Sequence, residues 1–312
     1  MLRIENLKLS PGGGPSALRN AVLHILRIPE KDLLALHILR RSIDAREGVR
    51  MVYTVEAEVA NEAAVLRRRD KHISRGTPRP AYQPPEAVSP PELPPVVVGA
   101  GPAGLFAALV LARAGARPIL LERGRKVEER SADVERFWAT GELDLTSNVQ
   151  FGEGGAGTFS DGKLTTRIGD ELCGFVTEVF LEHGAPKEIA WQQKPHVGTD
   201  LLRGVITSIR KEIESLGGEV HFNTALTGFE RRDGQLVGIQ TTDGAFPCEA
   251  LVFAVGHSAR DTFGMLMDSG LVLECKPFSV GFRAEHLQSE IEKSLYHEAA
   301  GHPALPRGEY QL

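Results

Sequence analysis

The first quarter of the chain alternates between apolar and polar residues in three stretches. Residues 2–9, 35–43 and 49–59 have the period of two that is typical of half-buried strands, and apolar residues after Ser16 recur at helical spacing. We therefore expect a small α/β module over residues 1–74. It carries no chemical motif, and the charged run at 67–71 is interpreted as a solvated helix end or linker. The module is a candidate docking surface.

Prolines then recur eight times between residues 77 and 95. Proline has no N–H and a fixed φ, so such a segment neither pairs in a sheet nor continues a helix, and it favours extended geometry. We expect a linker over residues 75–94 and a second domain starting at residue 95.

A run of three valines, 96–98, opens that second domain and predicts a fully buried strand. A glycine-rich turn follows, then a helix over 103–113 and a second strand over 118–121 that ends at Glu122. Glycines in this order permit a tight turn and close approach of a phosphate, while the helix N-terminus attracts a pyrophosphate and the acid can bind ribose hydroxyls. The stretch predicts a dinucleotide site whose candidate residues are Gly99, Gly101, Pro102, Ala103, Gly104, Glu122 and Arg123.

Further apolar periodicity extends the α/β pattern to residue 256. The helix expected over 126–141 would have Trp138 on its apolar side, and the helix over 199–216 would bury Leu201. The remaining elements that we expect are a helix over 172–183, a strand over 219–223, a hairpin of 226–231 with 236–241, and a buried strand over 250–256.

A glycine-rich loop lies between these elements, at residues 148–163. Its glycines disfavour regular structure and expose backbone N–H groups, which suits an anion or a flat polar ring. The alternative is a flexible surface loop, but Phe151 and Phe159 argue against it. The candidate cofactor contacts in this loop are Gly154, Gly155, Ala156, Gly157 and Thr158.

Composition restricts the class of protein. The 312 residues are 42% hydrophobic and 25% charged, which fits a soluble globular protein of at least two domains. A net charge of −5 argues against nucleic-acid or membrane-surface binding. The three cysteines form no CxxC pair, so we expect no metal site, disulfide framework or dithiol centre. Because the sequence has no signal-peptide core and no membrane-length apolar run, we expect a cytoplasmic protein.

Taken together, the motif at 99–104, residues 122–124, the strand at 219–222 and residues 254–256 resemble the two-dinucleotide-fold flavoproteins of the glutathione-reductase type. The resemblance implies FAD, with its pyrophosphate on the first motif and its adenosine ribose on the acid. It implies adenine contacts near Leu226. It also implies a chain that returns beneath the cofactor at Ala254, Val255 and Gly256.

Residues 148–166 and 276–286 resemble a narrower group, the bacterial uncharacterised FAD-dependent, or NAD(FAD)-utilising, dehydrogenases. This resemblance implies a Rossmann-like FAD-binding domain over 95–275 and the start of a β-rich substrate domain over 276–312. Family members continue past this length, so we expect a C-terminally truncated chain. The family name implies FAD, with NAD(P)H as a candidate electron donor, but no substrate.

In a flavoprotein the isoalloxazine ring carries the hydride chemistry, and the protein supplies orientation and charge. Candidate catalytic residues are His257 as an acid–base group, Lys163 as a cation near the ring, and Arg283 as a partner for a substrate carboxylate. Helix capping, solvation and a surface ion pair are their respective alternatives. We expect an FAD-dependent oxidoreductase acting on an unidentified small molecule. The alternatives are a nicotinamide-only Rossmann dehydrogenase and a non-catalytic FAD-binding regulatory protein.

Overall fold

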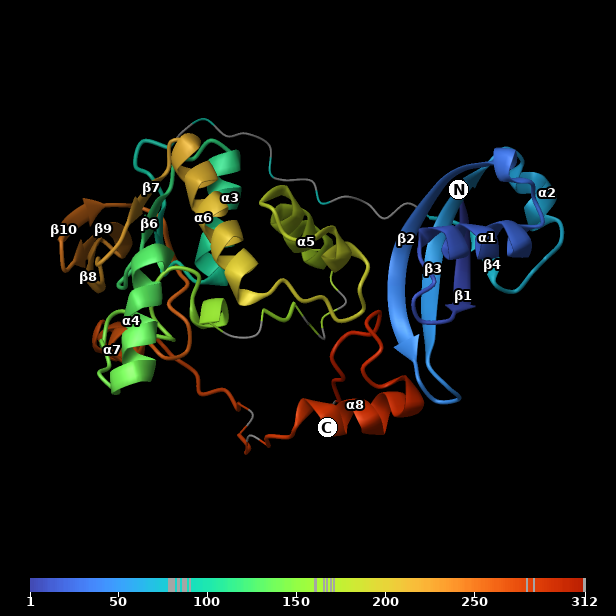
Figure 1. Ribbon diagram of the computed structural model, residues 1–312. Coiled ribbons are helices and arrows are strands. Elements are labelled where there is room, and N and C mark those ends of the chain that lie inside the picture. The colour runs from blue at the N-terminus through green and yellow to red at the C-terminus, as the bar shows by residue number, and fades with distance from the viewer. Residues whose placement is uncertain are drawn as a thin grey trace. The chain divides into compact units, whose positions relative to one another are not determined.

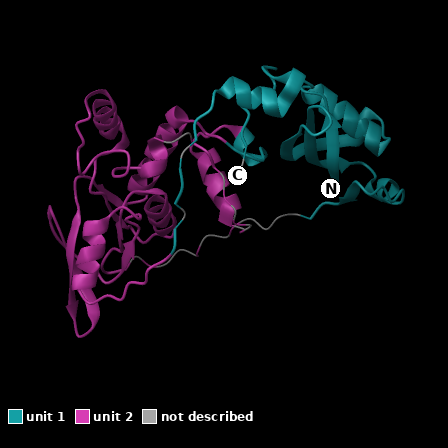
Figure 2. Ribbon diagram, turned by 90° about the horizontal axis from the view of Figure 1, so that it is seen from below, with its two compact units in different colours: residues 1–80, 188–195, 277–312 teal, residues 81–187, 196–276 magenta. Residues whose placement is uncertain are grey.

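A computed structural model describes residues 1–77, 82, 85, 89, 91–159, 162–164, 166, 168, 170, 172–278, 280–282 and 284–310. The chain divides into two compact units, each of which is described separately (Figure 2). Unit 1 comprises Met1–Pro80, Glu188–Pro195 and Pro277–Leu312, and unit 2 comprises Ala81–Lys187 and His196–Lys276. Much of the expected linker over 75–94 lies outside the described residues.

Unit 1 contains a four-stranded antiparallel sheet with the strand order β2-β3-β1-β4 (Figure 1). The chain order of strands and helices, together with this strand order, gives the split βαβ arrangement of ferredoxin-like folds. Leu18, Val22 and Leu26 of the first helix are buried in the same core as the inward face of the sheet. The elements are β1 (Leu2–Leu9), α1 (Pro15–Leu26), β2 (Leu33–Asp44), β3 (Arg50–Val59), α2 (Glu62–Leu66) and β4 (Ile73–Arg75).

Two later segments also belong to unit 1. Arg41 on β2 donates its N–H to the Trp191 carbonyl at 2.7 Å and accepts from the Gln193 N–H at 3.0 Å. The described part of residues 277–310 contains helix α8 (Gln288–Tyr296) and no strand. This differs from the β-rich start that we expected, because Ile291 and Leu295 lie four residues apart on one helical face and pack against Gly308.

Unit 2 is built on a parallel sheet with the strand order β11-β5-β6-β7, so the expected α/β fold is confirmed. The helices α3 and α6 lie on one side of it, and the antiparallel sheet β8-β9-β10 lies on the other (Figure 1). Val96 and Val98 pack with Leu226 and Ile239 of the second sheet, so the short apolar strands are covered on both faces. The strands are β5 (Val96–Val98), β6 (Ile119–Leu121), β7 (Glu219–His221), β8 (Leu226–Arg232), β9 (Gln235–Thr241), β10 (Gly244–Pro247) and β11 (Leu251–Phe253).

Two side chains on the helices of unit 2 are exposed where the sequence predicted them to be buried. Trp138 is 62% exposed and meets Phe159 edge-on, with ring centroids 6.4 Å apart, rather than entering the core. Leu201 is exposed, because the buried stripe of α6 starts one residue later, at Leu202. None of the described helices is long and apolar enough to cross a membrane. The helices are α3 (Pro102–Arg113), α4 (Val127–Thr140), α5 (Leu172–Glu182), α6 (Thr199–Ser215) and α7 (Arg260–Asp268).

Candidate functional site

A cavity of about 550 Å³ in unit 2 lies where three strands of the parallel sheet end. The chain leaves β5 through α3 to β6 on one side, and it returns much later as β11 on the other side of β5. In open parallel sheets this reversal of strand order creates a crevice at the carboxyl ends of the strands, and ligands bind there. The loops after β5, β6 and β11 all line the cavity.

Most of the residues predicted to bind a cofactor line this cavity. They are Gly99, Gly101, Pro102, Ala103, Glu122, Arg123, Gly155, Ala156, Leu226, Ala254, Val255 and Gly256. Of the catalytic candidates, His257 lines it, Lys163 does not but forms an isolated bridge with His196, and Arg283 lies outside the described residues. Gly104, Gly154, Gly157 and Thr158 are not among the lining residues.

The three glycines of the first motif have separate roles. A Cβ at Gly99, where φ is +100°, would lie 2.5 Å from the Ala254 carbonyl oxygen, so β11 passes directly beside this turn. A Cβ at Gly104 would lie 1.7 Å from the Gly99 oxygen, so α3 packs against the turn. A Cβ at Gly101 would meet only the Gly155 Cα, at 3.9 Å, and would otherwise project into open space. Gly101 is therefore the position where a bare backbone leaves room for a ligand.

The N-terminus of α3 adds an anion site to this opening. Gly101 is its N-cap and Pro102 its first residue, so the first N–H groups available are those of Ala103 and Gly104. Unpaired N–H groups and the helix dipole at such an end favour a phosphate. Gly101, Pro102 and Ala103 all line the cavity.

Glu122 joins the turns that surround the cavity. Its Oε2 accepts the Ala100 N–H at 2.8 Å, and its Oε1 accepts the Gly124 and Gly152 N–H groups at 2.9 and 3.0 Å. The sequence suggested only a ribose contact for this carboxylate, which is 5% exposed. A carboxylate has about four acceptor positions, so these three bonds leave room for one ribose hydroxyl.

The glycine-rich loop packs against the first turn. The Gly154 N–H donates to the Ala100 carbonyl at 2.8 Å, and a Cβ at Gly155 would lie 3.1 Å from the Gly101 Cα. One expectation is corrected here, because the N–H groups of Gly155 and Thr158 bond to carbonyls of Gly152 and Gly155 within the loop. The loop closes into a short 3₁₀ turn, Ala156–Phe159, that buries Thr158. The amides of Gly155 and Thr158 are thus used internally, while Gly155 and Ala156 still line the cavity.

Arg130 on α4 binds the backbone of this loop, and it was not predicted from the sequence. The side chain is fully buried, and its guanidinium donates to five loop carbonyls. A signal was present in the sequence, since Arg130 follows Val127 by three residues and precedes Val134 by four. A charged residue on the buried stripe of an amphipathic helix requires a buried partner.

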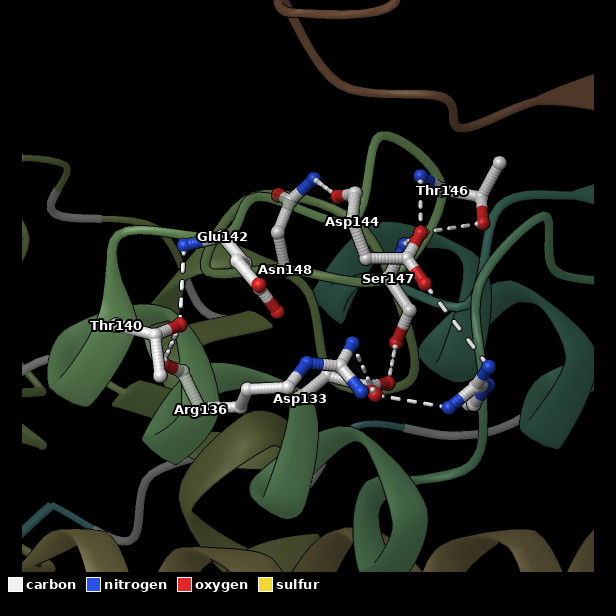
Figure 3. A network of polar contacts seen from close by, with 9 residues as sticks. Asp133, Arg136, Thr140, Glu142, Asp144, Thr146, Ser147 and Asn148 are labelled. Atoms are coloured by element: carbon white, nitrogen blue, oxygen red, sulfur yellow. Dashed lines mark hydrogen bonds and ion pairs between the residues drawn. The ribbon is translucent and has the colours of Figure 1, made fainter.

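A polar network fastens the start of the loop to α4 (Figure 3). Asp133, whose side chain is 2% exposed, accepts from Arg125 at 2.8 Å and from the Ser147 hydroxyl at 2.6 Å. Asp144 accepts the N–H groups of Thr146 and Ser147. The bond from the Thr146 N–H is the main cause of the lowered pKa of Asp144. The segment before the glycines is thereby fixed to the same helix that carries Arg130.

Arg123 closes the other edge of the cavity. Its guanidinium lies 4.6 Å from the centroid of the Phe151 ring and donates to Asp261 at 3.0 Å and to the Thr262 hydroxyl at 3.1 Å. It therefore links the glycine-rich loop to α7, a helix that the sequence did not predict. The other lining residues that were not proposed as cofactor contacts are Val98, Leu121, Val149, Gln150, Gly152, Thr224, Ala225, Phe253, Ser258, Phe263 and Leu266.

Glu153 is a second fully buried residue of charged type, and it lies in the loop itself. Its Oε2 accepts the Val127 N–H at the start of α4 at 2.7 Å, and its Oε1 lies 3.0 Å from the Arg210 Nε. Burial raises the pKa of this carboxyl to about 7, against the opposing effects of the Val127 bond and of Arg210.

We expect unit 2 to lose stability between pH 5 and 8. The unfolded chain has already released most of the Glu153 proton at pH 5, because its pKa is near 4.5, while the folded chain keeps the proton until about pH 7. The folded state therefore binds more protons in this interval, and stability falls as pH rises. The loss is on the order of 3 kcal/mol, because a tenfold change in proton affinity is worth about 1.4 kcal/mol. Between pH 5 and pH 8, we expect the free energy of unfolding in urea to fall less in Glu153→Gln than in the parent. The exposed control Glu129→Gln should lose as much stability with pH as the parent. The same loss in all three proteins would show that Glu153 does not cause the pH dependence.

Comparison with known proteins identifies the cofactor class. Residues 92–134 match a family described as FAD binding domain, and residues 203–308 match one described as FAD dependent oxidoreductase. Residues 1–60 match a domain of unknown function. The chain therefore contains sequence typical of the FAD-binding domains of oxidoreductases, and FAD is the cofactor of these domains.

The similar proteins are mostly longer than this chain. It is 45% identical over its whole length to an uncharacterized protein of Clostridium beijerinckii and covers 59% of that protein. It is 24% identical to protein FixC of Escherichia coli K12, over 64% of this chain and 44% of FixC. L-amino acid deaminase from Proteus vulgaris is similar over 62% of this chain and 53% of its own, with a TM-score of 0.31 and 14% identity.

Proposed function

We propose that this chain is the FAD-binding part of a flavin-dependent dehydrogenase that oxidises or reduces a small molecule. The single observation that carries the proposal is the cavity at the reversal of strand order, with Gly101 opening into it. The sequence resemblance to the bacterial uncharacterised FAD-dependent dehydrogenases supports the narrower family.

The residues around the cavity fit FAD. Gly101 and the free N–H groups at the start of α3 would hold the pyrophosphate, and the remaining acceptor position of Glu122 would take a ribose hydroxyl. Leu226 would contact the adenine, and residues 254–256 would lie beneath the cofactor. The missing side chain at Gly101 supports this fit, because any Cβ there would point into the cavity rather than into protein.

When bound, FAD supplies the ring that exchanges a hydride with the substrate. The chain itself would bind and orient that ring and limit its contact with water. His257 is exposed and lines the cavity, so it is the candidate acid–base residue, which would hold a proton at a nitrogen of its own imidazole ring. The roles of Lys163 and Arg283 stay predictions.

Purification of the chain with added FAD, followed by gel filtration and a visible spectrum, tests the proposal. We expect flavin absorption to co-elute with the protein at about one FAD per chain, and anaerobic NADH or NADPH to bleach it if either is the donor. Retention of NAD in place of flavin would contradict the proposal in favour of a nicotinamide-only dehydrogenase. Retained flavin that no donor or substrate reduces would favour a binding protein without catalysis.

A further inference from the structure

We propose that Arg130 is a positioning residue of the FAD site. It holds residues 148–155 in the shape that closes one wall of the cavity, although Arg130 itself does not line the cavity. This inference rests on the proposed function, because it assigns a role in FAD binding to a side chain that would not touch FAD. It also makes a claim about the loop that can be measured without the cofactor.

Every N–H donor of the Arg130 guanidinium bonds to a carbonyl of the loop. An arginine has five N–H donors, one on Nε and two on each Nη. All five are used by backbone carbonyls: Nε donates to Asn148 at 2.9 Å, Nη1 to Gly152 at 3.3 Å and Glu153 at 2.6 Å, and Nη2 to Val149 at 3.0 Å and Gly155 at 2.9 Å. One buried side chain therefore satisfies the carbonyls of five of the eight residues from 148 to 155.

The groups around Arg130 keep its buried side chain charged. Burial lowers the pKa of Arg130 to about 10, while the nearby carboxylates of Glu122 and Glu153 oppose that effect. The guanidinium thus stays protonated at neutral pH. A buried cation of this kind is tolerated because charge-assisted hydrogen bonds replace its contacts with water.

The loop that Arg130 holds is also the loop that completes the cavity. While its carbonyls face Arg130, the N–H of Gly152 bonds to Glu122 and the N–H of Gly154 bonds to the Ala100 carbonyl. Gly152 and Gly155 line the cavity. Without the guanidinium, each of the five carbonyls would lose one donor. The Gly152 and Gly155 carbonyls would keep an N–H bond from within the loop, and the loop would have to move toward water to recover the other hydrogen bonds. That movement would withdraw the cavity wall and the Gly152 bond to Glu122 together.

The five-carbonyl arrangement requires arginine rather than any cation. Lysine keeps the charge but has three donors on a single atom, so it cannot reach carbonyls spread around a planar guanidinium. Arg130→Lys should therefore behave as a loss of loop geometry with the charge retained. Phe159 also lies against this guanidinium, with its ring centroid 4.9 Å from the Arg130 Cζ, and lysine would lose that flat contact as well.

The test compares the parent with Arg130→Lys, Arg130→Ala and Arg232→Ala, the last removing an exposed arginine at the end of β8. FAD affinity is measured by fluorescence titration, and hydrogen exchange is measured by mass spectrometry on peptides that cover residues 146–159 without FAD. We expect FAD binding to weaken by about tenfold or more in both Arg130 variants and exchange in the loop to accelerate. Millimolar guanidinium should restore part of the binding of Arg130→Ala, and it should leave Arg232→Ala unchanged.

The outcomes separate this inference from the proposed function. Failure of the parent to bind FAD would contradict the proposed function, and the exchange data would then decide on Arg130 alone. Parent-like FAD affinity or unchanged loop exchange in Arg130→Lys would overturn the positioning role. If both Arg130 variants lost the helical circular dichroism of the parent, the residue would support the whole unit and the site-specific role would be wrong.

Discussion

Replacing Gly101 with valine is expected to abolish FAD retention while leaving the protein folded. The backbone of Gly101 has φ −72° and ψ −177°, which any residue adopts, and a Cβ there meets nothing closer than the Gly155 Cα at 3.9 Å. The new side chain would therefore occupy the space at the N-terminus of α3 where we place the pyrophosphate. We expect FAD affinity to fall by about a hundredfold or more, which corresponds to about 2.7 kcal/mol. FAD titration and urea unfolding of the apo-protein give the two readouts.

Unit 1 offers a matched control for this substitution. Gly14 is the N-cap of α1, it precedes a proline at the first helical position, and its φ of −70° and ψ of −171° are close to those of Gly101. No atom would lie within 4 Å of its Cβ. Gly14→Val thus repeats the same change of cap without a cavity, and FAD affinity should stay at the parent value. A loss of apo-protein stability that is clearly larger in Gly101→Val than in Gly14→Val would mean that the valine disturbs α3 itself and does not act only through the space that Gly101 leaves.

The βαβ unit around Gly101 could be predicted from the sequence because local physics determines it. Three valines flanked by proline and glycine form a strand, glycines permit the turn, and an acid follows the next strand. The longer amphipathic helices were found for the same reason, since their apolar stripes persist over several turns. The prediction of a dinucleotide cavity at 99–104 and 122 follows from these elements alone.

The supports of the cavity could not be predicted, because they depend on contacts between residues far apart in the chain. Glu122 bonds to Gly152, thirty residues later, and Arg123 bonds to Asp261 across 138 residues. No local pattern specifies such pairs. Short elements such as α2 and β10 were missed because five or four residues carry too little periodicity, and Trp138 was misplaced because an apolar side chain can pack on a surface as well as in a core.

Gly104→Ala is expected to have the opposite phenotype to Gly101→Val, namely a loss of stability. Gly104 is buried in α3, and a Cβ there would lie 1.7 Å from the Gly99 carbonyl oxygen and 2.9 Å from its carbon. These are backbone atoms next to β5, so relief requires the helix to move away from the sheet. We expect a loss of about 3 kcal/mol, at the upper end of what overpacking costs. The free energy of unfolding in urea, measured without FAD, provides the test.

Gly204→Ala is the matched control, since Gly204 also lies inside a helix, α6, but no atom would lie within 4 Å of its Cβ. Without a clash, alanine should stabilise the helix by about 0.5–1 kcal/mol, because glycine loses more backbone entropy on folding. The two glycine-to-alanine changes should therefore have opposite signs. A Gly104→Ala protein as stable as the parent would show that α3 can shift away from β5 at no cost. The close helix–strand packing would then not be what requires glycine at this position of the motif.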